Sequence, residues 1–420
     1  MTTVPGAAAH RTAVVIRFAE LVLLVAAMMS IQAVAIDAML PAFPSIVAAL
    51  HVSDPNRGQW VVTAYMTGLG VGQLFWGLLS DRFGRRPVLL GGLALYAAAA
   101  LSCGLSGSFA ALLAWRCVHG VSAASMTVVR STVRDLYSGR QMARVMSLTF
   151  MVFLTVPILA PSVGQLILAL GSWRSIFIVC SVFASLVWVW ARLRLPETLH
   201  PEYRLTLRPI QIAVAARLVL CDRTSIYYTL AGAMLFGAII AYVAMVQQIF
   251  ADTFQRAALM PLMFALCAAL MGIAAFCNSR WVERLGMRRI SHTALLVFIG
   301  VTALHLAVAA LGWERMWTFV ALQAATMGAF ALSVSNFGAM AMEPVGSIAG
   351  IGASLQGCIS TGTAALVGAA IGRLYQGSTV PLAGGTLCCG LAALVFVLAA
   401  ERGRLFRRHH AGTMQLGLVH

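Results

Sequence analysis

The chain has 420 residues, of which 60% are hydrophobic and only 10% are charged, and its formal net charge is +16. Soluble domains contain about 45–50% apolar and about 25% charged residues, so a water-soluble fold could not cover this much apolar surface. The apolar residues form blocks of about twenty, the length that crosses a hydrocarbon core of roughly 30 Å. The composition excludes a soluble protein and predicts an all-α membrane protein.

The position of the basic residues predicts an orientation in the membrane. All 29 are arginine, and most lie in alternate gaps between the apolar blocks, which is the positive-inside signature of cytoplasmic loops. A protein that neutralises nucleic-acid phosphates would gather them on one soluble face instead. We expect a bacterial inner-membrane protein with both termini in the cytoplasm, in contact with membrane lipid and with no nucleic-acid partner. The outer loops hold only Arg57, Arg174, Arg256, Arg315 and Arg373.

Apolar runs and the residues that interrupt them predict twelve transmembrane helices. These fall at about 17–40, 58–80, 87–106, 109–131, 143–169, 173–193, 225–250, 256–277, 290–311, 315–337, 346–373 and 379–400. The longest charged connection follows the sixth of them and divides the chain. We expect an N-terminal six-helix bundle at 1–193, a cytoplasmic linker at 194–224, a C-terminal six-helix bundle at 225–401 and a basic cytoplasmic tail at 402–420.

The first predicted span contains a carboxylate, Asp37, with Pro41 four residues later. An acid within the membrane costs roughly 2.5–3.5 kcal/mol on insertion scales, and it normally faces a cavity, a partner or a proton path. Asp37 is therefore a candidate for proton and substrate coupling. The alternative, an acid that anchors the helix end at the outer interface, stays open.

The loop after the second span carries the most specific motif. It reads Gly77-Leu-Leu-Ser-Asp-Arg-Phe-Gly-Arg-Arg86, and it resembles the signature loop of the major facilitator superfamily. The resemblance implies two pseudo-symmetric six-helix bundles and a gating loop on the cytoplasmic side. A weaker copy, Glu283-Arg-Leu-Gly-Met-Arg288, follows the eighth span, which supports two related halves. The matching residues are Gly77, Asp81, Arg82, Gly84, Arg85 and Arg86.

The fourth span contains Arg116 in the run Arg116-Cys-Val-His-Gly120. A guanidinium inside a span needs a carboxylate, backbone carbonyls or water around it. The run resembles the Arg-x-x-Gln-Gly motif of the same superfamily, in which the arginine helps set the protonation of acids in the central cavity. His119 replaces the glutamine here. Arg116 is thus a second coupling candidate, although a purely structural tie between helices stays open, and for His119 we favour a packing role.

Several segments resemble one branch of the superfamily, the Bcr/CflA drug:proton antiporters of bicyclomycin and multidrug resistance. The Asp37-x-x-x-Pro41 element matches an acid that is implicated there in proton and substrate coupling. The run from Arg130 through Arg134 to Asp-Leu-Tyr137 also matches. We expect both arginines at a cytoplasmic helix end, where they contact carbonyls and lipid phosphates rather than substrate.

The fifth span contains Pro157, Pro161 and Gly164, which resemble the antiporter motif of the superfamily. Proline removes a backbone donor and bends the helix, and neighbouring helices must satisfy the freed carbonyls. The expected use is a shaped, ion-tight interface between the halves. Ala160 and Gln165 depart from the motif, which has glycine at both positions.

Neutral polar side chains are the candidates for cavity lining. They are Tyr65 and Gln73 in the second span, and Gln247 and Asn336 in the second half. Amides within spans either orient a substrate or form hydrogen bonds between helices, and both interpretations stay open.

Together these features predict a proton-coupled antiporter that exports small organic molecules or drugs across the inner membrane by alternating access. The alternative is a facilitator-fold transporter for one metabolite, such as an amino acid, working as an exporter or importer. The sequence has no HExxH motif, P-loop or paired carboxylates, so we expect no enzyme and no catalytic residue. The expected partners are a small-molecule substrate and protons, with no cofactor and no metal, and we expect a monomer.

Overall fold

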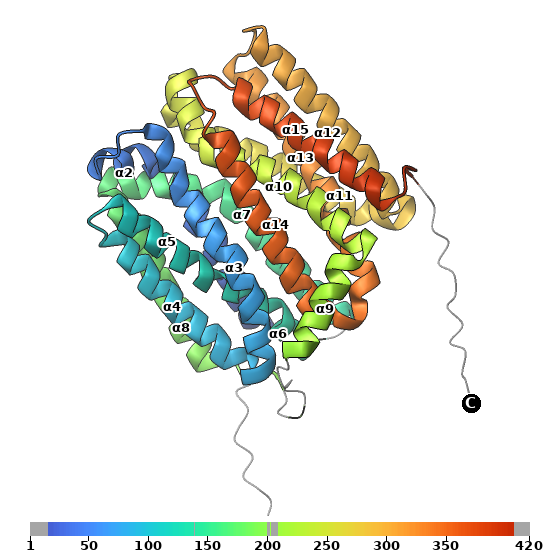
Figure 1. Cartoon of the computed structure of the whole chain (residues 1–420). Coiled ribbons are helices and arrows are strands. Elements are labelled where there is room, and N and C mark those ends of the chain that lie inside the picture. The colour runs from blue at the N-terminus through green and yellow to red at the C-terminus, as the bar shows by residue number, and fades with distance from the viewer. Residues whose placement is uncertain (1–15, 138, 200–201, 203–208, 407–420) are drawn as a thin grey trace, which may run out of the picture.

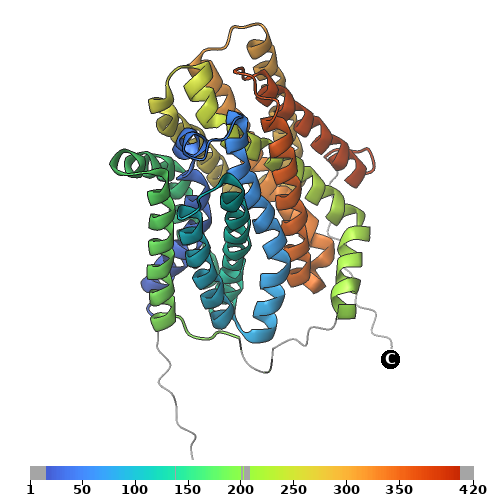
Figure 2. The same cartoon turned by 60° about the vertical axis from the view of Figure 1, so that its left-hand side comes forward.

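A computed structural model describes residues 16–137, 139–199, 202 and 209–406. The described chain is helical and contains no strand, and its long helices run across the molecule in two groups (Figures 1 and 2). The first group comprises α1 (Phe18–Asp37), α2 (Phe43–Ala49), α3 (Trp60–Phe83), α4 (Arg85–Gly104), α5 (Phe109–Ala123), α6 (Val128–Leu136), α7 (Gly139–Leu170) and α8 (Trp173–Arg194). The second comprises α10 (Arg223–Gln248), α11 (Met260–Leu285), α12 (Met287–Ala310), α13 (Met316–Met342), α14 (Ala349–Gly372) and α15 (Val380–Ala400).

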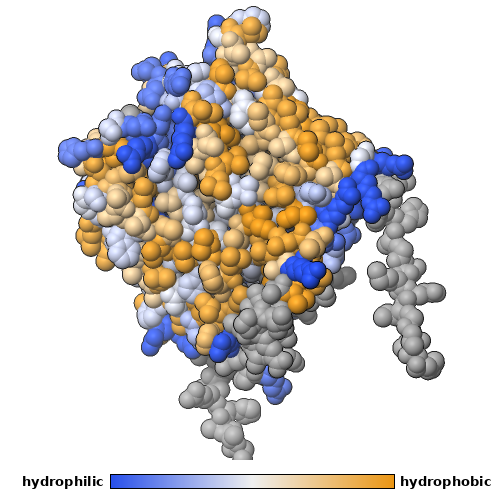
Figure 3. Space-filling view, in the orientation of Figure 1, coloured by the Kyte–Doolittle hydropathy of each residue, from blue (hydrophilic) through white to orange (hydrophobic). Residues whose placement is uncertain are grey.

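The predicted spans correspond to these helices. Among the described residues, 11 helical stretches are long and apolar enough to cross a membrane. The span predicted at 143–169 coincides with α7, a single helix that runs from Gly139 to Leu170. The outer flanks expose large apolar side chains, as Figure 3 shows, and a lipid-facing surface requires this. The prediction of an all-α membrane protein built from two six-helix bundles is confirmed.

The two bundles repeat the same turn after their second long helix. Gly84 ends α3 with φ at 105°, and Gly286 ends α11 with φ at 81°. Both values lie in the left-handed region that glycine tolerates and other residues rarely adopt. The next helix begins directly afterwards in each case, at Arg85 and at Met287. The sequence repeat is therefore also a repeat of backbone geometry.

We name the two ends of the bundles by their residues. The basic end carries Arg85, Arg194 and Arg288, and the far end carries Asn56, Gln248 and Tyr375. Helix α3 of the first bundle packs against α14 of the second, and α7 packs against α11. Figure 1 shows α3 and α14 side by side near the middle of the molecule. These two contacts form the seam between the bundles.

The connection between the bundles contains a further helix. Helix α9 (Pro209–Cys221) lies within the predicted linker and packs against α14 and α10. Residues 200–201 and 203–208 of that linker, and residues 407–420 of the predicted basic tail, lie outside the described residues.

Candidate functional site

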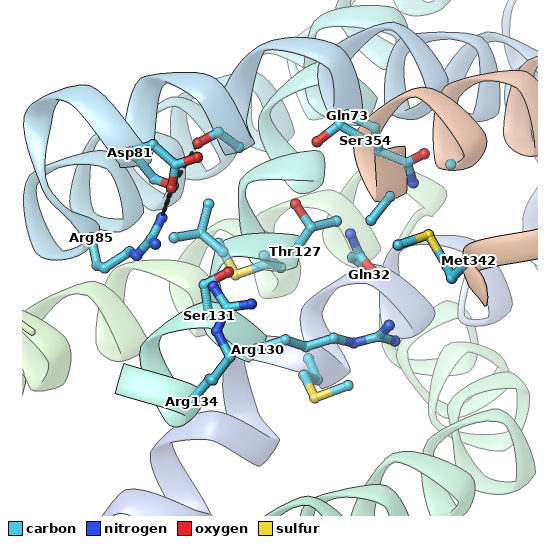
Figure 4. A pocket seen from close by; sticks show the side chains of 17 residues that line it. Gln32, Gln73, Asp81, Arg85, Thr127, Arg130, Ser131, Arg134, Met342 and Ser354 are labelled. Atoms are coloured by element: carbon cyan, nitrogen blue, oxygen red, sulfur yellow. Dashed lines mark hydrogen bonds and ion pairs between the residues drawn. The ribbon is translucent and has the colours of Figure 1, made fainter. Parts of the chain in front are cut away.

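A cavity of about 500 Å³ lies between the two bundles, toward the basic end. Its walls come from α1, α3, the α4 N-terminus and α6 in the first bundle, and from α13 and α14 in the second (Figure 4). A volume of this size suits a drug-sized molecule. A site built from both bundles is also the arrangement expected of transporters with repeated halves.

The lining combines neutral polar, apolar and charged side chains. Gln73 projects from α3, and its Oε1 accepts a hydrogen bond of 3.4 Å from the Thr361 hydroxyl of α14. Gln32 of α1 lines the same space and donates to the Ala123 carbonyl at 2.8 Å. Each amide thus lines the cavity and also forms a hydrogen bond with another helix or backbone segment of the protein.

Three of the four expected lining residues lie outside this cavity. Tyr65 is fully buried under Arg116, and Asn336 donates to Asn278 at 2.8 Å inside the second bundle. Gln247 is also buried, and its Oε1 has no hydrogen-bond partner. Helix rotation explains the difference, because neighbouring positions of one helix point about 100° apart. Gln73 faces α14 and the cavity, whereas Tyr65 faces α5.

Arg130 and Arg134 also line the cavity. They project from α6 one helical turn apart, together with Ser131 of the same helix and Thr127 of the preceding 3₁₀ segment, as Figure 4 shows. The expectation that placed them only among carbonyls and lipid phosphates is therefore incomplete. The 3₁₀ segment Ala124–Thr127 connects α5 to α6, and both the segment and α6 contribute lining residues to the space between the bundles.

Asp37 is the last residue of α1, and only 7% of its surface is exposed. Among the described residues, no hydrogen bond or ion pair reaches its carboxylate. A carboxylate with little water and no cation partner is costly in its charged form. The chain continues through a 3₁₀ turn (Leu40–Ala42) into α2, so Asp37 lies inside a helical stretch that runs from Phe18 to Ala49.

Arg116 is fully buried and binds backbone carbonyls of two other helices. Its Nε donates to the Val61 carbonyl of α3 at 3.1 Å, and its Nη1 donates to the Ala35 carbonyl of α1 at 3.2 Å. The Ala35 carbonyl lies two residues before Asp37, so the guanidinium fixes the part of α1 that carries the acid. The remaining Nη2 has no hydrogen-bond partner in the part of the chain that the structure describes. Arg116 also lies 4.4 Å from the centre of the Tyr65 ring, in cation–π geometry.

The loop from Gly77 to Arg86 makes most of its polar contacts within the first bundle. Arg85 contacts the Asp81 carboxylate at 2.5 Å and the Asp135 carboxylate at 3.0 Å. Glu197 accepts the backbone N–H of Arg85 at 2.9 Å, so it caps the N-terminus of α4. Gly77 is the loop residue that approaches the second bundle, because a Cβ there would lie 2.8 Å from the Ser354 hydroxyl of α14. The loop thus forms one side of the cavity mouth.

The remaining loop arginines are held by other contacts. Arg86 donates to the Arg192 carbonyl at 2.7 Å, and Arg82 lies over the Phe83 ring. Gly84 leaves room for the Glu197 carboxylate, which a Cβ would overlap.

Helix α7, which carries the proline and glycine residues of the fifth predicted span, contacts both α1 and α11. Pro157 and Pro161 lie inside this helix. Gly164 packs so closely on α1 that a Cβ would overlap the Ala38 carbonyl oxygen. The glycine therefore brings the α7 backbone directly against the residue that follows Asp37.

A hydrogen-bond network closes the space between the bundles at the far end. Gln59 donates to the Gln248 side chain at 2.5 Å, and Gln248 donates to Asn56 at 3.0 Å. Asn56 in turn donates to the Tyr375 carbonyl at 3.0 Å, and the Tyr375 hydroxyl donates to the Gln248 carbonyl at 3.1 Å. Sequence reasoning missed this network, because Asn56 and Gln59 resemble ordinary loop residues. The adjacent amides Gln247 and Gln248 were its only signal.

Comparison with known proteins shows which family has this architecture. The family model described as Major Facilitator Superfamily matches residues 23–369. A bicyclomycin resistance protein homolog of Haemophilus influenzae is 29% identical over 87% of this chain and 91% of its own length. A chloramphenicol resistance protein of Pseudomonas aeruginosa is 35% identical over 38% of each chain. Among solved structures, the xylose transporter XylE from E. coli has a TM-score of 0.72 at 13% identity, covering 94% of this chain and 99% of its own.

Proposed function

The chain belongs to the major facilitator superfamily, and we propose that it is a proton-coupled antiporter that exports small organic molecules by alternating access. It is a multi-pass membrane transporter and not an enzyme. We place the basic end and both termini in the cytoplasm, because arginine-rich loops stay on that side of bacterial membranes. The proposed domains are the bundles 1–193 and 225–401, with the linker 194–224 and the tail 402–420.

The unpaired carboxylate of Asp37 carries the proposal. A buried acid without a cation partner avoids the free-energy cost of a buried negative charge by taking up a proton. It can release that proton when the site is hydrated or a cation approaches. Arg116 and Gly164 hold the backbone on either side of this acid, through Ala35 and Ala38. Proton binding at Asp37 would therefore act on the packing of α1 against α7 and on the hydrogen bond that Arg116 of α5 donates to α1.

The two ends of the molecule support a conformation that faces the cytoplasm. The cavity lies toward the basic end, and the amide network joins the bundles at the far end. Substrate would enter from the cytoplasm, and opening of the far-end network would release it outside. Protonation of Asp37 from the outside would then favour the return step.

The direction of transport and the drug-like cargo rest on the relatives. Two of these relatives are named for resistance to bicyclomycin and to chloramphenicol. Export is the direction of transport that gives resistance to a drug. A mixed apolar and polar lining discriminates weakly between similar molecules, which suits a carrier of several drugs. A carrier for one metabolite would instead give growth effects with that compound alone.

Transport in inverted membrane vesicles tests the coupling. We expect a pH gradient to drive drug uptake into vesicles that hold the wild-type protein, and we expect an uncoupler to abolish it. Asp37→Asn should lower the gradient-driven rate at least 10-fold. The matched control is Asp54→Asn, because Asp54 is exposed at the far end and asparagine keeps its capping bond to the Asn56 N–H. Full gradient-driven transport by Asp37→Asn would refute the coupling role.

A further inference from the structure

We propose that the cavity selects organic anions, and that Arg130 and Arg134 are the residues that select them. The inference rests on the proposed transport function and specifies its substrate class. Both side chains line the cavity from α6, at positions four apart, which lie on one face of a helix.

The distribution of acidic residues leaves these two arginines without a counter-charge. The chain has 13 acidic residues, and of these only Asp81 lines the cavity. Arg85 already pairs with the Asp81 carboxylate at 2.5 Å. Among the described residues, no ion pair or hydrogen bond of the Arg130 or Arg134 side chain is found.

Four other acids of the basic end already have partners, whereas Glu343 follows the lining residue Met342 in the chain without lining the cavity itself. Glu20 pairs with Arg194 at 2.6 Å, Asp135 pairs with Arg85 at 3.0 Å, and Glu401 pairs with Arg288 at 2.7 Å. Glu197 caps α4. The stretch 136–196, which includes α7 next to α6 in the chain, has no acidic residue at all. The cavity wall therefore carries two arginines that have no ion-pair partner among the described residues.

Unpaired guanidinium groups in such a wall favour one class of ligand. Arginine binds carboxylate, sulfonate and phosphate groups with two parallel hydrogen bonds. Both side chains are exposed to solvent, so they act through their summed charge, which attracts an anion into the cavity and repels a cation. Discrimination by charge therefore needs no further contact.

The rest of the lining suits the uncharged part of such a molecule. Met29, Met126 and Met342 supply flexible apolar surface, and methionine adapts to varied shapes. Gln32, Gln73 and Ser354 supply neutral hydrogen-bonding groups around it. The fitting ligand is an amphipathic organic anion that a cavity of about 500 Å³ can hold.

An oxyanion at these arginines could belong to a soluble substrate or to a lipid headgroup of the inner leaflet. We infer a soluble substrate, because Arg130 and Arg134 share the cavity with Gln73 of α3 and Ser354 of α14, at the seam between the bundles. A headgroup site would face the outer flank. The experiment below distinguishes the soluble substrate from the lipid headgroup.

The test compares two dyes of one scaffold, carboxyfluorescein as the anion and rhodamine 6G as the cation, with chloramphenicol as the neutral compound. Inverted vesicles of phosphatidylcholine hold the purified full-length protein under a pH gradient. We expect kcat/KM for the anion to exceed that for the cation at least 10-fold. The double variant Arg130→Gln/Arg134→Gln should lower the anion-to-neutral ratio at least 10-fold. Arg280→Gln, an exposed arginine of the basic end outside the cavity lining, should leave that ratio unchanged.

Two results would overturn the inference. One is equal transport of the two dyes, or an unchanged ratio in the double variant. The other is an effect of the double variant that appears only when phosphatidylglycerol is added, because the arginines would then serve headgroups. Equilibrium binding of carboxyfluorescein in detergent separates this inference from the proposed function. If that binding depends on the two arginines and weakens with salt but no probe follows the pH gradient, the anion site stands and the proton coupling falls.

Discussion

Gln59 at the start of α3 and Gln248 at the end of α10 join the two bundles at the far end through a side-chain hydrogen bond of 2.5 Å. Gly372 makes this contact possible, because a Cβ there would overlap the Gln59 side-chain oxygen. The bond and its neighbours Asn56 and Tyr375 are all neutral. Uncharged groups thus join the two bundles at the far end, whereas arginines line the space between them at the basic end.

Removal of the far-end amides should open that end. A neutral hydrogen bond contributes about 1 kcal/mol, which is roughly a fivefold shift in a two-state equilibrium. We expect Gln248→Ala, which loses two such side-chain bonds, to raise amide hydrogen exchange in segments 55–61 and 371–377. Addition of 1 M salt should have little effect on this exchange in the wild type, because the network carries no charge.

The control for this experiment is Gln255→Ala. Gln255 is exposed at the same end, and its side chain bonds only to the nearby Asp252 carbonyl at 2.8 Å. Equal exchange in wild type and Gln248→Ala would show that the network does not hold the far end closed.

An alanine at Gly164 should separate α7 from α1. The new Cβ would overlap the Ala38 carbonyl oxygen, which is backbone and cannot rotate away. Overpacking of this kind costs about 1–3 kcal/mol. We expect Gly164→Ala to lower the thermal unfolding midpoint and to reduce gradient-driven transport, because Ala38 follows Asp37.

A glycine with free space around it provides the comparison. Gly300 lies inside α12, and no heavy atom lies within 4 Å of a Cβ built there. Gly300→Ala should keep or slightly raise the unfolding midpoint, since alanine favours a helix by about 1 kcal/mol. If Gly164→Ala and Gly300→Ala had the same unfolding midpoint, the contact between α7 and α1 at Gly164 would have room for a Cβ.

The second bundle has an acid whose charge should stabilise the fold. Burial tends to raise the pKa of Glu401, but hydrogen bonds from Arg288 and Tyr228 outweigh it, so the pKa lies below its ordinary value of 4.5. A depressed pKa means that this stabilisation is present above pH 4.5 and is lost as the pH falls through the folded-state pKa. We expect Glu401→Gln to lower the unfolding midpoint at pH 7, with a smaller difference from wild type below pH 4.

The exposed acid Glu283 is the matched control for that titration. Glu283→Gln should follow the wild-type curve from pH 7 to pH 3. A Glu401→Gln protein whose deficit stayed constant over this range would show that shape, and not charge, accounts for the loss.

Much of the architecture could be predicted from the sequence because its signals are local. Blocks of apolar residues mark spans wherever they occur, and Gly84 and Gly286 mark turns through their own backbone angles. The cavity wall could not be predicted in the same way, because it depends on the rotation of α3 and of α6 about their own axes and on how the two bundles pack together. Gln73 and Tyr65 differ by eight positions on one helix, yet one faces the seam and the other faces Arg116. The far-end network joins Gln59 to Gln248, about 190 positions apart, and Asn56 to Tyr375, about 320 positions apart. No local sequence pattern predicts pairs that are so distant in the chain.

The replacement of glutamine by His119 in the fourth-helix motif should be nearly neutral. Arg116 is always a donor, so His119 Nδ1, which lies 3.2 Å from the Arg116 Nη1, must be the unprotonated nitrogen that accepts. The proton then resides on Nε2, which is buried without a partner, and the ring is uncharged. A glutamine oxygen can accept from Arg116 in the same way. We expect His119→Gln to change the free energy of unfolding by less than about 1.5 kcal/mol, the usual limit for well-tolerated swaps.

The same geometry predicts that the pH dependence of transport will not change. Because the His119 ring is neutral and accepts from a permanent cation, we expect it to take no part in the proposed proton coupling, and His119→Gln should give the wild-type profile of rate against pH. Arg116→Lys is the sensitive comparison, because a single ammonium cannot reproduce the planar fork that binds the carbonyls of Val61 and Ala35. That variant should lose both stability and gradient-driven transport. A shift in the pH profile of His119→Gln would instead place the histidine on the proton path beside Asp37.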